Sequence, residues 1–218
     1  MMSSVIVSLC SVFVGWLLSQ FSAPLNDFIK CRRVKQCLIE ELDEINDHVD
    51  RTLLIYTRNL QIIALNGIST TTPITITANI FKHHYKDAVL GLNKAQRQSY
   101  QLIYSQVEAI NDGIKELNGI IDKHDINSST TEPEVKILHE KIQQKIIAEF
   151  HNAAIAKWHI EFHLNNTDNP MMDLHSDIHK NYIEYNKSID ENCIKIIHDA
   201  KKDLDRSQFI EKIGIYWI

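Results

Sequence analysis

The first 23 residues carry no charged side chain, and their apolar core runs from Val5 to Phe21. A helix needs about 17 to 25 predominantly apolar residues to cross a bilayer, so this segment reaches the lower limit. No basic residue precedes the segment and no small-residue cleavage site follows it, which disfavours a removable signal peptide. The pattern therefore predicts that residues 1–23 form a retained transmembrane anchor.

Basic residues follow this segment closely, whereas none precedes it. Because Lys and Arg accumulate in cytoplasmic flanks, the asymmetry predicts a single-pass protein of the inner (plasma) membrane, with its N-terminus outside and its C-terminal domain cytoplasmic. The same residues are placed to contact anionic headgroups at the membrane surface. This basic cluster consists of Lys30, Arg32, Arg33 and Lys35.

Small residues recur on one face of the segment, within an arc of roughly 80° at about 100° per helical residue. In a bilayer, helices associate where small side chains let backbones approach and where hydroxyl groups bond across. We therefore expect this face to pack against a second copy or another membrane protein. The alternatives are that Ser is merely tolerated there, or that several copies line a narrow pore. The face comprises Ser4, Ser8, Ser11, Gly15, Ser19 and Ser22.

Beyond Pro24, apolar residues recur three and four positions apart, which predicts helices that bury one face. A long juxtamembrane helix is expected over residues 24–66, ending at Asn66-Gly67. Further helices are expected over residues 78–90, 93–123, from the loop at 124–134 to Leu164, and from Asn169-Pro170 to about Leu204. Between residues 103 and 121 the spacing is that of a coiled coil, for fewer than three heptads. The residues expected to face the core include Leu38, Leu42, Ile45, Val49, Tyr56, Ile63, Ile103, Val107, Ile110, Ile114, Leu117, Leu138, Ile142, Ile146, Phe150, Ile160, Leu174, Ile178, Ile189 and Cys193.

Two segments do not follow the helical pattern. Residues 68–77 alternate Ile with Thr, but a single strand there has no evident partner, so a loop is expected. The apolar tail 213–218 is expected to cover the core or to bind a partner. The expected fold class is all-α: an N-terminal single transmembrane helix (1–23), the juxtamembrane helix (24–66) and the remainder of a cytosolic bundle (67–218). That bundle would hold four or five helices, the long ones antiparallel.

The composition narrows the function classes. A net charge of −5 argues against a nucleic-acid partner, because such domains usually carry a basic stripe. The four cysteines form no CxxC pair, so neither a zinc ribbon nor a thioredoxin-type motif is indicated. Phosphate-binding glycine loops, nucleophile elbows and zinc-protease motifs are absent from the sequence. The sequence therefore leans against an enzyme and predicts no cofactor.

Histidine offers the one candidate metal site. Two pairs of histidines at four-residue spacing lie on either side of the loop that joins two predicted helices: His159 with His163, and His175 with His179. Such spacing places two imidazoles on one side of a helix, where zinc could bind. The apolar stripes, however, place the two pairs on opposite sides of the helix–helix contact. Zinc is therefore kept only as a weak alternative.

These features predict a non-enzymatic, membrane-anchored helical protein that acts through oligomerisation and protein–protein interaction, as a scaffold or regulatory subunit with an unidentified cytosolic partner. One alternative is an effector that permeabilises the membrane. At the level of architecture alone, small anchored helical proteins of this kind occur among bacterial stress and phage-defence effectors. A second alternative is a His-rich metal-binding protein.

Overall fold

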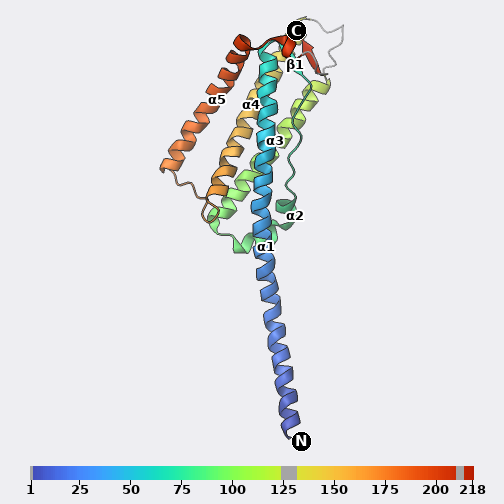
Figure 1. The fold of residues 1–218 in the computed structure, drawn as a ribbon, viewed down its shortest axis with the longest axis vertical. Helices are drawn as coiled ribbons and strands as arrows, with labels where there is room; N and C mark the ends of the chain where they lie inside the picture. The colour runs from blue at the N-terminus through green and yellow to red at the C-terminus, as the bar shows by residue number, and fades with distance from the viewer. Residues whose placement is uncertain (1, 124–131, 210–213) are drawn as a thin grey trace. The chain divides into compact units, whose positions relative to one another are not determined.

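The computed structural model of the chain describes residues 2–123, 132–209 and 214–218, except for the side chains of residues 2–10, 17, 18, 21 and 23. The described chain is helical over most of its length, which confirms the all-α part of the predicted fold. The elements are α1 (Met2–Ala64), β1 (Gly67–Ser69), α2 (Asn79–Ala88), η1 (Val89–Gly91), α3 (Lys94–Lys123), α4 (Glu132–Asn165), α5 (Asp177–Asp203), η2 (Arg206–Phe209) and β2 (Ile215–Trp217) (Figure 1).

The predicted transmembrane helix is wrong. Among the residues that the structure describes, no helix contains 18 consecutive residues apolar enough to cross a membrane. From Ser11, where the described side chains begin, serines interrupt the apolar residues, and Gln20, Asn26 and Asp27 follow within the same 18-residue length. The prediction of a single-pass protein of the inner membrane, with an outside N-terminus and a cytoplasmic C-terminal domain, depended on that helix and is therefore wrong too.

The break expected at Pro24 is also absent, because α1 continues through that proline. Two compact units divide the chain: unit 1 comprises Met1–Glu41 and Asn79–Asn93, and unit 2 comprises Leu42–Ala78 and Lys94–Ile218. The predicted segments 1–23, 24–66 and 67–218 stay a prediction, and the units divide α1 at a different place.

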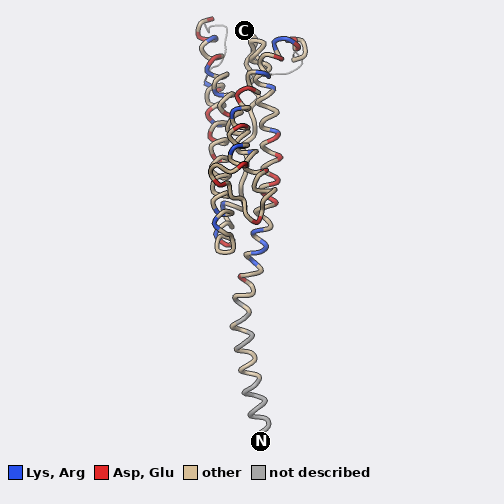
Figure 2. Tube along the Cα trace, turned by 90° about the vertical axis from the view of Figure 1, so that its left-hand side faces the viewer, with Lys and Arg blue, Asp and Glu red and all other residues tan. Residues whose placement is uncertain are grey.

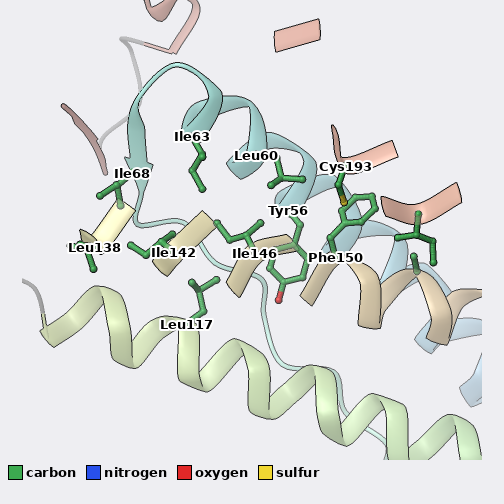
Figure 3. Close-up of a cluster of buried hydrophobic side chains, with 12 residues drawn as sticks. Tyr56, Leu60, Ile63, Ile68, Leu117, Leu138, Ile142, Ile146, Phe150 and Cys193 are labelled. Carbon is green, nitrogen blue, oxygen red and sulfur yellow. The ribbon is translucent and has the colours of Figure 1, made fainter. Parts of the chain in front are cut away.

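Unit 2 is built around the apolar stripes that the sequence predicts. The α4 helix lies between α3 and α5, and the second part of α1 packs on the same core (Figure 1). Figure 3 shows Tyr56 and Leu60 of α1 beside Ile146 of α4, with Leu117 of α3 below them. Burial of such side chains is the main stabilising contribution, at roughly 1.5 to 3 kcal/mol each. The core cluster comprises Tyr56, Leu60, Ile63, Ile68, Leu117, Leu138, Ile142, Ile146, Phe150, Ala154, Ile189 and Cys193.

Two segments expected to be irregular pair as a small sheet. β1 and β2 run antiparallel, with Ile68 opposite Tyr216. Gly67 is required beneath the Trp217 ring, because a Cβ at this position would lie 2.6 Å from a ring carbon. The loop prediction for residues 68–77 is therefore wrong at its start: the missing partner strand is the C-terminal tail.

The last long helix begins later than the sequence predicts. α5 starts at Asp177, and the Ser176 hydroxyl accepts a hydrogen bond from the backbone N–H of His179 at 3.1 Å. Leu174, which was expected to face the core, is 75% exposed, and the buried residues of α5 begin at Ile189. The side-chain cap, rather than Asn169-Pro170, sets the start of this helix.

Candidate functional site

The candidate site is a run of exposed apolar side chains on α1, within unit 1. Val12 is 69% exposed, Phe13 58% and Trp16 57%, and Phe28 further along is 66% exposed. Large apolar side chains that cluster on a surface mark an interaction site more often than scattered ones do. We name this run the exposed apolar segment; its described large apolar residues are Val12, Phe13, Val14, Trp16, Leu25, Phe28 and Ile29.

These side chains point in many directions around the helix. Consecutive residues of a helix are rotated by about 100°, so Val12, Phe13 and Val14 point to three different sides. A helix with one apolar stripe suits a single groove, whereas a helix that is apolar all round is normally surrounded by neighbours. The exposed apolar segment is apolar on more than one side, with small residues on the remaining arc, so a single groove would leave part of its apolar surface exposed.

The predicted small-residue face lies on the same segment. Ser11, Gly15, Ser19 and Ser22 are exposed, and the side chains of Ser4 and Ser8 lie outside the described residues. The Ser22 hydroxyl donates to the Ser19 carbonyl of its own helix at 2.9 Å, so it is not dependent on a neighbouring helix for a partner. A Cβ added to Gly15 would meet nothing within 4 Å. Beside Gly15 the predicted face therefore has open space, which lets another helix backbone approach.

The basic cluster follows this segment directly. Two of its four residues, Lys30 and Lys35, contact α2 and η1. Lys30 forms an ion pair with Asp87 at 3.1 Å, and this hydrogen-bonded contact lowers the pKa of Asp87. The Lys35 ammonium donates to the Gly91 carbonyl at 3.1 Å. Arg32 and Arg33 are exposed and have no ion pair or hydrogen bond with any residue that the structure describes. Figure 2 shows the described part of the segment mainly in tan, with red just before the blue of the basic cluster.

Glu41 fixes the position of α2 within unit 1. Its carboxylate is buried and accepts hydrogen bonds from the backbone N–H groups of Ile80 at 2.6 Å and Phe81 at 3.0 Å. Those N–H groups lie in the first turn of α2, where helices leave donors unpaired and a carboxylate is favoured. Sequence reasoning missed this residue, because a single Glu in a charged helix carries no local signal of its distant partner.

The structure does not bring the four histidines of the zinc hypothesis together. The His163 Nδ1 lies 2.8 Å from the Ser99 hydroxyl of α3, whereas the His159 ring contacts Tyr182 of α5, at 5.1 Å between centroids. The other two rings, His175 and His179, lie 6.1 Å from each other, outside the core. Among the residues described, no group of three or more His, Cys, Asp or Glu side chains is placed to hold a metal ion.

The two buried histidines are instead packed as neutral core residues. Burial lowers the pKa of His159 from its ordinary value of 6.5 to about 4, and it lowers the pKa of His163 equally to about 4. The low pKa means that both rings are uncharged near pH 7. Their aromatic neighbours, Tyr100 beside His163 and Tyr182 beside His159, are consistent with a packing role.

An open surface depression of about 470 Å³ lies between α3 and α4 in unit 2. Lysines dominate its polar lining, and its one acidic side chain, Glu116, is already bound by Lys145. Lys115 is likewise paired, with Asp112 at 2.8 Å. Exposed lysines around an open surface depression give it no defined ligand. Its lining comprises Lys115, Glu116, Gly119, Ile120, Lys123 and Lys141.

Comparison of the chain with protein-family models, curated proteins and solved structures gives no match. The class is therefore set by the fold and the surface alone: a predominantly helical protein with two compact units, in which the first part of α1 presents exposed apolar side chains on several sides.

Proposed function

We propose that this chain is a non-enzymatic scaffold or regulatory protein that self-associates through the exposed apolar segment of α1. The observation that carries the proposal is the exposure of Val12, Phe13 and Val14, at 69%, 58% and 52%, on three different sides of one helix. In this proposal, unit 2 supplies a helical surface for a further protein partner.

A second copy of the chain is the occupant that this surface favours. A partner with one groove would cover one side of α1 and leave the others exposed, whereas several copies can cover each other on more than one side. Gly15 supports close approach, since no described atom fills the space that its Cβ would take. Every molecule of the protein carries this segment, so a second copy is always present as a binding partner.

The energetics favour an assembly of more than two copies. Burying seven large apolar side chains that are already partly covered is worth on the order of 10 kcal/mol. Association costs about 4 to 15 kcal/mol in lost freedom of motion, so one shared face supports weak pairing only. Additional copies bury additional sides of each helix and strengthen the assembly.

The oligomeric mass of the full-length chain tests this proposal. Light scattering over a range of concentrations should give a mass above that of one chain, and Val12→Lys with Trp16→Lys should reduce it. Leu54→Lys is the matched control, because Leu54 lies on the same helix and is exposed to the same 69% as Val12. A wild-type chain that stays monomeric, or equal effects of Val12→Lys and Leu54→Lys, contradicts the proposal.

The alternative of a membrane-permeabilising effector depended on the transmembrane helix and is not carried forward. No arrangement of the described residues favours the metal-binding alternative, since the two histidine pairs have different surroundings.

A further inference from the structure

The tetrapeptide Leu-Asn-Gly-Ile occurs twice in the chain, at residues 65–68 and at residues 117–120. An asparagine loses its side-chain amide most readily when glycine follows it, because glycine leaves the next backbone nitrogen unhindered and free to rotate. Both copies lie in unit 2 and have the same immediate neighbours in sequence. A difference in deamidation between them must therefore come from the structure around each one.

Deamidation of this kind needs only water. The backbone nitrogen of the glycine attacks the side-chain carbonyl carbon of the asparagine, and ammonia leaves with the proton of that nitrogen, so that a five-membered succinimide ring remains. Water then opens the ring at either carbonyl. One product is aspartate in an unchanged main chain. The other is isoaspartate, in which the main chain runs through the former side chain and is one atom longer.

The structure restricts this reaction at Asn118. Gly119 lies within α3, where its N–H belongs to the helical hydrogen-bond pattern and its peptide cannot rotate alone. The Asn118 Oδ1 also accepts a hydrogen bond from the Thr72 hydroxyl at 2.6 Å, which holds the side chain away from its own backbone. The Gly119 nitrogen can therefore reach the side-chain carbonyl only when this part of α3 unfolds.

Asn66 lies instead in the turn between α1 and β1, and its side chain is exposed. Its φ of 60° lies in the left-handed region, which asparagine tolerates better than most residues. The Ile218 N–H donates to the Asn66 carbonyl at 2.9 Å. Hydrogen-bonded and non-hydrogen-bonded pairs alternate along an antiparallel ladder, so the next pair, Gly67 with Trp217, exchanges no hydrogen bond. No hydrogen bond to β2 therefore occupies the Gly67 nitrogen.

The strand β2 nevertheless restrains the ring closure. The peptide between Asn66 and Gly67 must rotate until the Gly67 nitrogen faces the side-chain carbonyl. That peptide contains the carbonyl to which Ile218 donates, and a Cβ on Gly67 would lie only 2.6 Å from the Trp217 ring. The peptide is thus free to rotate only when β2 has moved away. Because β2 is three residues long, it opens locally far more often than a long helix does.

We propose that Asn66 is a site of spontaneous deamidation in the folded protein, and that docking of β2 sets the rate. The isoaspartate product makes the opening of β2 permanent. It converts the carbonyl that Ile218 binds into a carboxylate outside the main chain, and it lengthens the chain beneath Trp217, where no space is available. The apolar strand Ile215–Trp217 is then released from β1. This inference does not depend on the proposed self-association.

Peptide mapping of the full-length chain compares the two copies directly. The folded protein is incubated at mildly alkaline pH, digested with trypsin and analysed by mass spectrometry; peptide 59–82 contains Asn66 and peptide 116–123 contains Asn118. Asn66 should convert at least about ten-fold faster than Asn118 in the folded chain, and the two rates should agree within about two-fold in urea. Equal rates in the folded protein, or unequal rates in urea, overturn the proposal.

Arg206→Ala tests the role of β2. The Arg206 guanidinium donates to the Ile218 carbonyl at 3.0 Å, so its removal should accelerate conversion of Asn66 several-fold and leave Asn118 unchanged. Arg51→Ala, at an exposed position in unit 2, controls for loss of an arginine. Conversion of Asn66 at the wild-type rate in the Arg206 variant overturns the control by β2.

The release of β2 is measured on the converted protein. Ion exchange separates the deamidated forms by their added negative charge, and fragmentation distinguishes isoaspartate from aspartate. In the isoaspartate form, hydrogen exchange at the Ile218 amide should be faster than in the unconverted chain. Asn66→Gly keeps the positive φ and lacks the amide, so it should accumulate no such form. Unchanged protection of Ile218 in the isoaspartate form overturns the release.

Discussion

The carboxylate of Glu149 on α4 occupies the space that a side chain on Gly113 of α3 would need. Glu149 is 3% exposed, and its Oε1 forms an ion pair with Lys145 at 2.9 Å. Burial of a charge is tolerated only when it is paired, so Gly113 admits the carboxylate and Lys145 offsets its charge. Burial of the phenol raises the pKa of Tyr56, and the nearby charge of Glu149 raises it further.

Gly113→Ala should destabilise the protein although alanine is the better helix former. The new methyl group would displace the buried carboxylate, and an unpaired or poorly paired buried charge costs about 1 to 3 kcal/mol or more. Urea denaturation measures the free energy of unfolding. Gly119→Ala is the control: it lies in the same helix, a Cβ there meets nothing within 4 Å, and a gain of about 0.5 to 1 kcal/mol is expected. Equal stabilisation by both substitutions would show that Glu149 can move freely.

The helical stripes could be predicted from the sequence because they depend on local periodicity. Leu38, Leu42 and Ile45 lie at three- and four-residue spacing and are at most 1% exposed. The Glu149–Gly113 contact could not be predicted, because it depends on which turn of α3 lies beside which turn of α4. Spacing fixes the face of each helix, but it does not fix the axial register of a pair.

Acidification should weaken the fold through His159 and His163. The pKa of each ring is lowered by burial from 6.5 to about 4, so the unfolded chain binds more protons between these values. The stability from the neutral rings is complete above about pH 6.5 and is lost as the pH falls towards 4. The loss should reach up to about 3 kcal/mol for each ring.

Urea denaturation at several pH values between these limits measures this dependence. His159→Phe should reduce it by about half, because His163 remains; phenylalanine preserves the aromatic contacts of His159 with Trp158 and Tyr182. His83→Gln, at an exposed position, should leave the dependence unchanged. An unchanged slope in the His159 variant would mean that its ring is already protonated, or exposed, in the folded protein.

Arg206 should hold the small sheet in place. Its Nε donates to the Leu65 carbonyl and its Nη2 to the Ile218 carbonyl, each at 3.0 Å, and the guanidinium lies 5.1 Å from the Trp217 ring centroid. Arg206→Ala should cost about 1 to 2 kcal/mol locally. Hydrogen exchange at the Ile218 and Thr70 amides, which donate to Asn66 and Gly214, should accelerate relative to that in α3. Unchanged protection would contradict this role, and Arg51→Ala is the matched control.

The sheet shows why part of the fold lay beyond sequence reasoning. β1 and β2 are separated by almost the whole of unit 2, and each strand is only three residues long. Neither segment carries enough alternation to be identified alone, and the pairing becomes evident only when α1 and α5 bring both ends together. The apolar run from Val5 to Phe21 could be identified in the sequence because it is local, but its transmembrane interpretation was wrong, and the exposed Leu25, Phe28 and Ile29 lie beyond it.

Gly15→Leu should weaken self-association without weakening the fold. A side chain at Gly15 meets open space within the chain, and leucine favours a helix by about 1 kcal/mol over glycine. A bulky residue would keep a second backbone from approaching, so the dissociation constant should rise about ten-fold or more. Analytical ultracentrifugation measures it, and Gly119→Leu is the control with equally open space. Equal dissociation constants for both variants would place the contact on another side of α1.

Chelation should leave the stability of the protein unchanged. Zinc binding by the histidines would require three or more ligands in one place. His163 is instead held by Ser99, and His159 lies among aromatic rings. The purified chain should therefore carry less than one equivalent of zinc by elemental analysis, and its thermal midpoint should not shift with EDTA. His198→Ala provides a background for adventitious binding by an exposed histidine. Stoichiometric zinc that His159→Phe removes, together with a lower midpoint after chelation, would restore the metal-binding alternative.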